Sequence, residues 1–366
     1  MALVSAGQPV AHAGVTAAAP TRTEWRTFHE YLKELAAAGK FSGAVLVAEN
    51  GRPILKRAYG MADSAKNEAN TPETKFNIGS MNKMITSVAV AQLVQKGKLS
   101  FEDTIGKYVD GFPSEIADKV TVHHLLTHTS GLGDITHKEG DKEVLDIDLL
   151  LKEIAKQQLK FEPGTRWEYS NAGFVVLGAI VERVSKQDYN GYVRKHILKP
   201  AGMHDTYFGA YTPSKVAHMA HPYALFDASG QWIGMPQSPG GSAPEGELRD
   251  IGDQPSGATP TGGAISTVGD MLKFSQALQG RRLLNAKLTK TIMEGKAQMG
   301  KDLKYAYGFM DQSLNGVRIV GHSGGTLGYG SELDMYPTKG YTVVILTNQD
   351  LVIFEPLKKS QTLVTG

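Results

Sequence analysis

The strongest constraint on the fold is a helical stretch that is apolar or small on nearly every side. It runs over residues 84–94 with the sequence Met-Ile-Thr-Ser-Val-Ala-Val-Ala-Gln-Leu-Val. A helix that is apolar around its circumference has to be surrounded by protein. The Lys-Gly-Lys at residues 96–98 places basic side chains around a glycine, which is typical of a helix end. The sequence therefore predicts a buried central helix.

Ser80 and Lys83 stand at the predicted N-terminus of this helix, three residues apart. That spacing puts both side chains on one face, with Cβ atoms roughly 5–6 Å apart, so the amine can take the proton of the hydroxyl. A serine hydroxyl is a weak nucleophile that needs such a neighbour. The helix N-terminus also favours developing negative charge. Alone, however, the S-x-x-K motif is common, and its ordinary interpretation is a solvated helix start.

Strand patterns occur at both ends of the chain and helical patterns in its middle. An amphipathic helix at 23–38 precedes a hairpin at 41–48 and 53–59, and further strands are predicted near the C-terminus, at 305–311, 317–322, 331–336 and 342–347. We expect an α+β fold in which these strands pair in one central antiparallel sheet flanked by helices. A mainly helical region carries Ser80.

No linker separates the chain into independent domains. Residues 1–22 are predicted to be a disordered leader or the remnant of a signal peptide, and residues 23–366 a single catalytic domain. Within it, the sheet region covers roughly 23–75 and 265–366, and the helical region roughly 76–264. Ala-His-Ala at 11–13 is similar to a signal-peptidase site, although no positive segment precedes it. This pattern favours a periplasmic or secreted protein over a cytoplasmic one.

Composition excludes several classes of function. The net charge is +2, which gives no support for a nucleic-acid or membrane-surface partner. Cysteine is absent, so disulfides and thiol catalysis are excluded. No stretch approaches the roughly 18–20 apolar residues of a membrane span. The oligomeric state is not indicated.

A second candidate motif is the Tyr-Ser-Asn at residues 169–171, between a turn at 162–164 and an apolar helix predicted at 172–184. A tyrosine near a lysine can act as a general base or relay a proton to a leaving group. The Asn171 amide can hydrogen-bond both a lysine and a substrate carbonyl. Taken alone, the commoner interpretation is a helix N-terminus with a packed Tyr169.

The third candidate motif is the Gly-His-Ser-Gly-Gly at residues 321–325, after a predicted strand. Small residues let a substrate lie close to the backbone. A backbone N–H here, together with that of Ser80, would form an oxyanion hole. The same letters match the G-x-S-x-G nucleophile elbow, which requires a helix directly after Ser323. Glycines interrupt the following residues, and no histidine follows His322, so the elbow is the less favoured interpretation.

Taken together, the three motifs resemble those of the serine β-lactamase and penicillin-binding-protein superfamily, in order and separation. The closest likeness is to the class C-like branch, with its family VIII esterases, D-alanyl-D-alanine carboxypeptidases and D-aminopeptidases, and it covers roughly residues 24–350. The Leu-Leu-Thr-His-Thr-Ser-Gly-Leu at 125–132 and the Phe-Glu-Pro-Gly at 161–164 also resemble signatures of this branch. The resemblance implies a β-lactamase/transpeptidase-like fold.

The resemblance also implies roles for individual residues. Ser80 would be the nucleophile, Lys83 its base, and Tyr169 the second base and leaving-group acid. Asn171, His322, Ser323, Gly324 and Gly325 would bind the substrate, and the backbone N–H groups of Gly325 and the nucleophile would form the oxyanion hole. β-Lactamases of this branch carry Lys-Thr-Gly at the third motif, so the histidine here argues against strong β-lactamase activity.

The expected function is that of a serine hydrolase acting through an acyl-enzyme on a small ester, an amide or a D-amino-acid peptide. Two alternatives remain open, an acyltransferase using the same site and a non-catalytic sensor of β-lactams or peptidoglycan. No metal or organic cofactor is implied. His124 and His128 have helical i, i+4 spacing, but Leu125 occupies the glutamate position of H-E-x-x-H, so we interpret them as structural.

Overall fold

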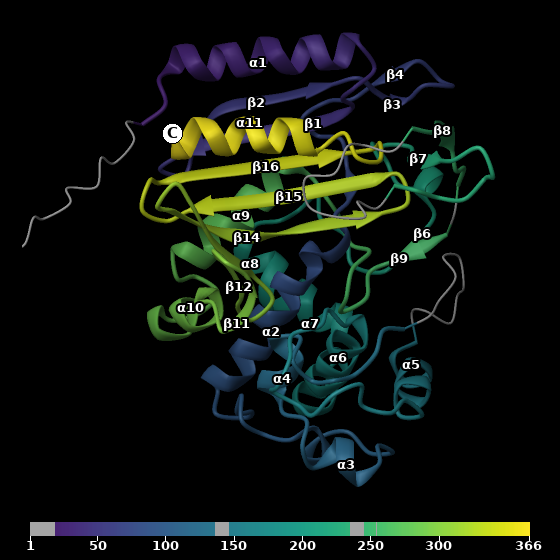
Figure 1. Ribbon diagram of the computed structural model, residues 1–366, viewed down its shortest axis with the longest axis vertical. Helices are drawn as coiled ribbons and strands as arrows, with labels where there is room; N and C mark the ends of the chain where they lie inside the picture. Colours follow the sequence, from purple (N-terminus) through teal and green to yellow (C-terminus); the bar gives the residue numbers. More distant parts are fainter. Residues whose placement is uncertain (1–18, 136–145, 235–244, 254) are drawn as a thin grey trace, which may run out of the picture.

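The computed structural model describes residues 19–135, 146–234, 245–253 and 255–366, and its centre is an eight-stranded antiparallel sheet (Figure 1). The strand order is β11-β12-β13-β14-β15-β16-β1-β2. The strands are β1 (Gly43–Glu49), β2 (Arg52–Tyr59), β11 (Ala297–Gly300), β12 (Leu303–Tyr305), β13 (Met310–Leu314), β14 (Val317–Thr326), β15 (Tyr329–Tyr336) and β16 (Tyr341–Thr347). Residues 1–18 of the predicted leader lie outside the described residues.

The sheet joins the two ends of the chain, as predicted. β1 lies between β2, its hairpin partner, and β16, close to the C-terminus, with Val45 opposite Ile345. Smaller two-stranded pairs surround the sheet: β3 (Met61–Asp63) with β4 (Glu68–Ala69), β5 (Phe76–Asn77) with β10 (Ile265–Ser266), β6 (Ala210–Tyr211) with β9 (Ser256–Gly257), and β7 (Tyr223–Phe226) with β8 (Glu247–Asp250).

Helices cover both faces of the sheet. Alternate residues of a strand point to opposite faces, so Val45 and Val47 pack with α1 (Arg22–Ala37) and α11 (Phe354–Thr365). Figure 1 shows these two terminal helices together on one side. Ala44 and Leu46 belong to the core on the other side, with α2 (Asn82–Gln95) and α9 (Val268–Gln279). Every residue of α2 from Asn82 to Leu93 is buried, which confirms the predicted central helix.

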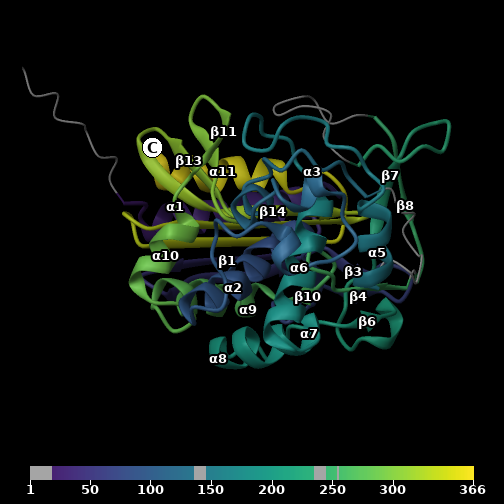
Figure 2. The same cartoon turned by 90° about the horizontal axis from the view of Figure 1, so that it is seen from below.

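A helical region packs around α2 on the side of the sheet away from α1 and α11, and Figure 2 views the molecule from there. Its main helix is α6 (Asn171–Ser185), and its shorter elements are η2 (Ile105–Lys107), α3 (Ser114–Ala117), α4 (Val122–Leu126), α5 (Ile147–Ile154), α7 (Tyr189–Val193), the π-helical turn η4 (Arg194–Leu198), α8 (Lys199–Ala201) and η5 (Pro213–Lys215). α10 (Ala286–Met293) packs between this region and the sheet edge. No helix within the described ranges combines the length and the apolar character needed to cross a membrane.

One predicted strand differs from the structure in detail. The strand at 305–311 is interrupted, because Ala306 and Phe309 close a tight turn between β12 and β13. The helical segment that begins with α7 changes to π-helical hydrogen bonding at Arg194. β7 pairs with the distant β8 and also with the segment that follows it, since Phe226 bridges to Trp232 and the Ile233 N–H donates to the Leu225 carbonyl at 2.9 Å.

Two carboxyl groups, Glu332 and Asp334, are buried on β15. They stand two residues apart and therefore share a face. Asp334 accepts hydrogen bonds from Tyr336 (3.2 Å) and from Gln361 of α11 (2.9 Å). Burial raises the pKa of Asp334 to about 6, and burial together with the neighbouring Asp334 raises the pKa of Glu332. A carboxyl whose pKa is higher in the folded than in the unfolded chain lowers stability as pH rises through that interval.

We therefore expect Glu332→Gln to raise the melting temperature by a few degrees at pH 8 and to leave it nearly unchanged at pH 4, where both carboxyl groups are largely protonated. The glutamine amide can also donate to Asp334. Thermal melts between pH 4 and 9 measure the effect, with the exposed Glu34→Gln as the matched control. An unchanged or lower melting temperature at pH 8 would contradict the inferred repulsion.

Candidate active site

Ser80 lies in the 3₁₀ turn η1 (Gly79–Met81), directly before α2, as the sequence predicted. Gly79 has a φ of +48° and is packed against β14, so that a Cβ here would lie 2.7 Å from the Gly325 nitrogen. Only glycine accommodates both the conformation and the contact. The Asn77 side chain accepts a hydrogen bond from the Gly79 N–H (2.8 Å) and fixes the turn. The half-buried Ser80 is therefore held against the sheet.

Lys83 is fully buried, and its amine contacts three oxygen atoms. Nζ lies 3.0 Å from Ser80 Oγ, 2.7 Å from Asn171 Oδ1 and 2.8 Å from the carbonyl oxygen of Thr261. The number of acceptors matches the three donors of an ammonium group. The amine is thus hydrogen-bonded in full although water does not reach it.

Tyr169 reaches the same serine from the loop before α6. Its hydroxyl donates to Ser80 Oγ at 2.8 Å. Ser170 caps α6 by accepting from the Gly173 N–H, and its own N–H donates to Nδ1 of the buried His128. The His128 ring packs on the Tyr169 ring with centroids 4.3 Å apart. The structure therefore brings together the first two motifs.

The surroundings shift the proton affinities of these groups in opposite directions. Burial lowers the pKa of Lys83 to about 7, an effect that the carboxylate of Asp134 partly opposes. Burial raises the pKa of Tyr169 above that of an ordinary phenol. The ionised forms of both groups are disfavoured because neither is well solvated. Near neutral pH the amine can lose its proton, whereas the phenol keeps its own.

The third motif lies on β14, beside the serine turn. A Cβ on Gly324 would lie 2.2 Å from the Ile78 carbonyl oxygen and 2.9 Å from the Ser80 nitrogen, so the two backbones are in direct contact. This contact brings the backbone nitrogens of Ser80 and Gly325 to adjacent positions. Ser323 is half-buried on the same strand. β14 continues to Thr326 and pairs with β15. The helix that a nucleophile elbow requires after Ser323 is therefore replaced by a strand.

His322 is buried, and its ring is held by groups other than Ser80. Nε2 lies 2.8 Å from the Tyr305 hydroxyl, and Nδ1 is hydrogen-bonded to the Ser323 carbonyl oxygen. Since a carbonyl only accepts, Nδ1 carries the proton and Nε2 accepts from Tyr305. Burial, with Lys83 nearby, lowers the pKa of His322 to about 3. The ring is therefore neutral and engaged on both nitrogens.

Two contributors to the site were not identified from the sequence. One is the carbonyl of Thr261, in a loop that Asn82 fixes by donating to Thr259 O and Gly262 O, both at 3.0 Å. Every residue has a backbone carbonyl, so the residue type does not show which carbonyl accepts a hydrogen bond. The other is Asp134, which contacts Asn171. As an acidic residue two positions after the 125–132 motif, it was visible in the sequence.

His124 and His128, the two histidines with i, i+4 spacing, form hydrogen bonds to nearby backbone groups. His124 forms a capping box with Thr121 at the start of α4, and His128 Nδ1 accepts from Ser170. Within the described residues, no cluster of three or more His, Cys, Asp or Glu has the arrangement of a metal site.

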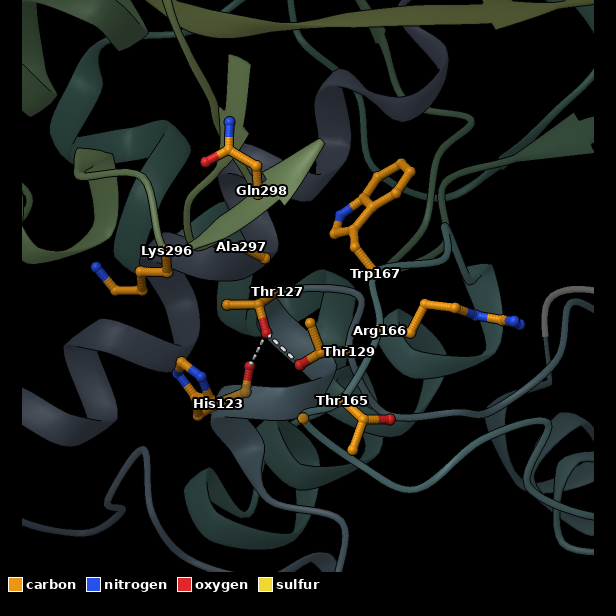
Figure 3. A pocket seen from close by; sticks show the side chains of 10 residues that line it. His123, Thr127, Thr129, Thr165, Arg166, Trp167, Lys296, Ala297 and Gln298 are labelled. Carbon is orange, nitrogen blue, oxygen red and sulfur yellow. Dashed lines mark hydrogen bonds between the residues drawn. The ribbon is translucent and has the colours of Figure 1, made fainter. Parts of the chain in front are cut away.

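A cavity of about 310 Å³ lies between α4, the loop at 164–167 and β11 (Figure 3). Trp167 forms one wall, and its ring packs edge-on against His128, with centroids 6.2 Å apart. His128 in turn packs on Tyr169, so one aromatic layer separates the cavity from Tyr169. The lining residues are His123, Thr127, Thr129, Gly164, Thr165, Arg166, Trp167, Lys296, Ala297 and Gln298, and none of them was a predicted site residue.

Comparisons with known proteins show similarity over most of the chain. The family model described as Beta-lactamase matches residues 28–360. A penicillin-binding protein of Bacillus subtilis (strain 168) is 29% identical over 85% of this chain and 69% of its own length. Esterase EstB of Burkholderia gladioli is 29% identical over 88% of both chains. The crystal structure of a penicillin-binding protein from Bacillus halodurans superposes with a TM-score of 0.76 at 28% identity, covering 92% of this chain and 98% of that one.

Because both ring nitrogens of His322 are engaged, we expect His322→Ala to lower kcat/KM by about tenfold and to lower the melting temperature, since the Tyr305 hydroxyl loses its partner. The midpoint of the pH–rate profile should stay that of the wild type. Rates from pH 5 to 9 and thermal melts test this, with the exposed His204→Ala as control. A complete loss of turnover, with a changed pH dependence, would instead make His322 the general base.

Proposed function

The chain belongs to the β-lactamase family, and on that premise we propose that it is a serine hydrolase that forms a covalent acyl-enzyme on Ser80. The observation that carries the proposal is the set of hydrogen bonds around the Lys83 amine. The sheet and helical regions act as one catalytic unit in this proposal, because Ser80 and Lys83 come from the helical region and Gly325 from the sheet.

The hydrogen bonds direct the lone pair of a neutral lysine. A neutral amine has two N–H donors and one lone pair, and Lys83 has two acceptors besides the serine, namely Asn171 Oδ1 at 2.7 Å and Thr261 O at 2.8 Å. When both N–H groups donate to these oxygens, the lone pair points at Ser80 Oγ. The deprotonated amine is then oriented to receive the serine proton.

The pKa shifts favour Lys83 over Tyr169 as the base for acylation. A lysine with a pKa of about 7 is neutral in a large fraction of molecules at neutral pH. The phenolate of Tyr169 is rare at the same pH, because burial raises its pKa. Tyr169 therefore serves as a proton donor. Of the two roles that the resemblance implied for Tyr169, we thus propose that of leaving-group acid.

In the proposed acylation step, the serine proton passes through Lys83 and Tyr169 to the leaving group. Ser80 Oγ forms a bond to the substrate carbonyl carbon while its proton passes to Lys83 Nζ. The backbone N–H groups of Ser80 and Gly325 stabilise the oxyanion. As the bond to the leaving group breaks, Tyr169 protonates that group and recovers a proton from the Lys83 ammonium. Water then attacks the acyl carbon and gives one proton to Lys83 Nζ, which passes it to Ser80 Oγ as the bond between Oγ and the acyl carbon breaks. The carboxylic acid leaves, and the alcohol of Ser80 is restored.

The substrate class that we propose is a small ester or amide, and the esterase relative matched over most of both chains supports the ester. An alcohol or amine in place of water would make the enzyme an acyltransferase. A sensor that only binds has no need of an oriented lysine lone pair, so the hydrogen bonds argue against it. Product analysis with and without added alcohol distinguishes a hydrolase from a transferase.

We expect Ser80→Ala to abolish turnover of short-chain nitrophenyl esters without loss of the fold, since a half-buried hydroxyl contributes little packing. Mass spectrometry of the wild type with a slow ester, a D-alanyl peptide or nitrocefin should show an acyl adduct on the peptide that contains Ser80. Ser87→Ala, on the same helix, is the matched control, because the Ser87 hydroxyl has no hydrogen-bond partner. An adduct on Ser323 would overturn the assignment.

The pH dependence follows from the direction of the lysine shift. Only neutral Lys83 accepts the serine proton, so kcat/KM should rise with pH, with a midpoint near 7, and stay level in mildly alkaline solution. Lys83→Arg keeps a positive charge that is not lost in this range, so it should be inactive from pH 5 to 9. Initial rates measure both, with the exposed Lys96→Arg as control. Near wild-type turnover in Lys83→Arg would exclude the amine as base.

A further inference from the structure

Asp134 lies beside Asn171, in the loop that follows α4. Its Oδ1 accepts from the Asn171 backbone N–H at 3.1 Å, and its Oδ2 accepts from the side-chain Nδ2 at 3.3 Å. One carboxylate therefore binds the same asparagine twice, at the N-terminus of α6. Negative charge at this end of a helix is also favourable.

The backbone that carries Asp134 is itself fixed. Gln157 Oε1 accepts from the Gly133 N–H at 3.0 Å, and Gln157 Nε2 donates to the Asp134 carbonyl at 3.1 Å. The Ser170 hydroxyl donates to the Gly133 carbonyl at 2.8 Å, which ties this loop to the residue just before Asn171. The carboxylate is exposed, but its position relative to α6 is set by these three contacts.

The two neighbours of the Asn171 amide determine which way the amide faces. Its oxygen and nitrogen are nearly equal in size, so hydrogen bonds alone decide the orientation. A carboxylate accepts and does not donate, so Nδ2 is directed to Asp134 and Oδ1 to Lys83. In the flipped amide, Nδ2 would face the lysine. It would donate to the amine lone pair, which would then no longer be directed at Ser80.

We propose that Asp134 is a positioning residue that holds the Asn171 amide in the one orientation that directs the Lys83 lone pair to Ser80. This inference rests on the proposed function, since it concerns the base of that reaction. Asp134 acts through Asn171 and touches neither the nucleophile nor the reacting carbonyl. The two residues that orient the Lys83 amine in this proposal, Asn171 and Asp134, lie outside the S-x-x-K motif.

The charge of Asp134 provides a second quantity that can be measured, namely the pKa of Lys83. Of the titratable groups around Lys83, the phenol of Tyr169 and the buried imidazoles of His128 and His322 are neutral near pH 7, and the carboxylate of Asp134 raises the lysine pKa. Removing that carboxylate should lower the pKa of Lys83 further. This shift reports the charge of Asp134 beside Lys83, whereas the acylation rate reports the orientation of the Asn171 amide.

The test is a double-mutant cycle with Asp134→Asn and Asn171→Ala. The acylation rate with a nitrophenyl ester is measured from pH 5 to 9 by mass spectrometry of the Ser80 adduct. Asp134→Asn should slow acylation about 10- to 100-fold, as the loss of a charged hydrogen bond predicts, and move the midpoint below that of the wild type. In the Asn171→Ala background, Asp134→Asn should cause little further loss of rate.

Two further variants separate charge from orientation. Asp134→Glu keeps the charge but displaces the carboxylate, so its rate should fall while its midpoint stays closer to that of the wild type. Asp146→Asn makes the same change at another exposed helix cap, that of α5, and should leave both readouts unchanged. Thermal melts of every variant show whether a slow rate reflects lost folding.

The outcomes distinguish this inference from the proposed function. If the wild type forms no adduct, or if Ser80→Ala still turns over, the proposed function fails. If the wild type forms the adduct and Asp134→Asn acylates at the same rate with the same midpoint, only the role of Asp134 is overturned. An equal loss of rate from Asp134→Asn in both backgrounds would also overturn it, because Asp134 would then act independently of Asn171.

Discussion

The site depends on one buried amine. Lowering the pKa of Lys83 from 10.5 to about 7 corresponds to roughly 5 kcal/mol, and the surrounding core supplies that free energy. The amine is tolerated because three oxygens from three segments accept its protons: Ser80 Oγ, Asn171 Oδ1 and Thr261 O. A buried amine without those partners would destabilise the protein. The fold thus has to bring η1, α6 and the 259–262 loop to one point.

The sheet provides the rigid side of that arrangement. Pairing β1 with β16 joins the ends of the chain, and the strand order then leaves β14 next to the serine turn. Gly79 and Gly324 allow backbone to meet backbone, which places the nitrogens of Ser80 and Gly325 side by side. A larger residue at either position would separate the two regions. The relative position of the Ser80 and Gly325 nitrogens, which form the proposed oxyanion hole, therefore depends on how closely the helical region and the sheet pack.

Features that depend on residue type or on hydrophobic periodicity could be predicted from the sequence. The apolar stretch at 84–94 indicated the central helix, and the strand patterns at both ends of the chain indicated the sheet pairing. The ordered motifs indicated the meeting of Ser80, Lys83, Tyr169 and Asn171. It could not show which groups a side chain contacts: the hydrogen bond between the His322 ring and Tyr305 is seen only in the structure. The Thr261 carbonyl was also invisible, because every residue has one, and only tertiary structure selects which of them accepts from a lysine.

The proton affinities around Ser80 follow one physical rule. Burial disfavours each charged form, so it lowers the pKa of Lys83 and His322 and raises that of Tyr169. The pKa values of the three groups therefore differ widely. His322 is already neutral well below pH 7, and Tyr169 keeps its proton well above pH 7. Lys83 alone among the three exchanges a proton near pH 7. Environments that push neighbouring pKa values apart assign the acid and base roles. In the proposed mechanism, desolvation at one site therefore favours the lysine as the base and the tyrosine as the acid.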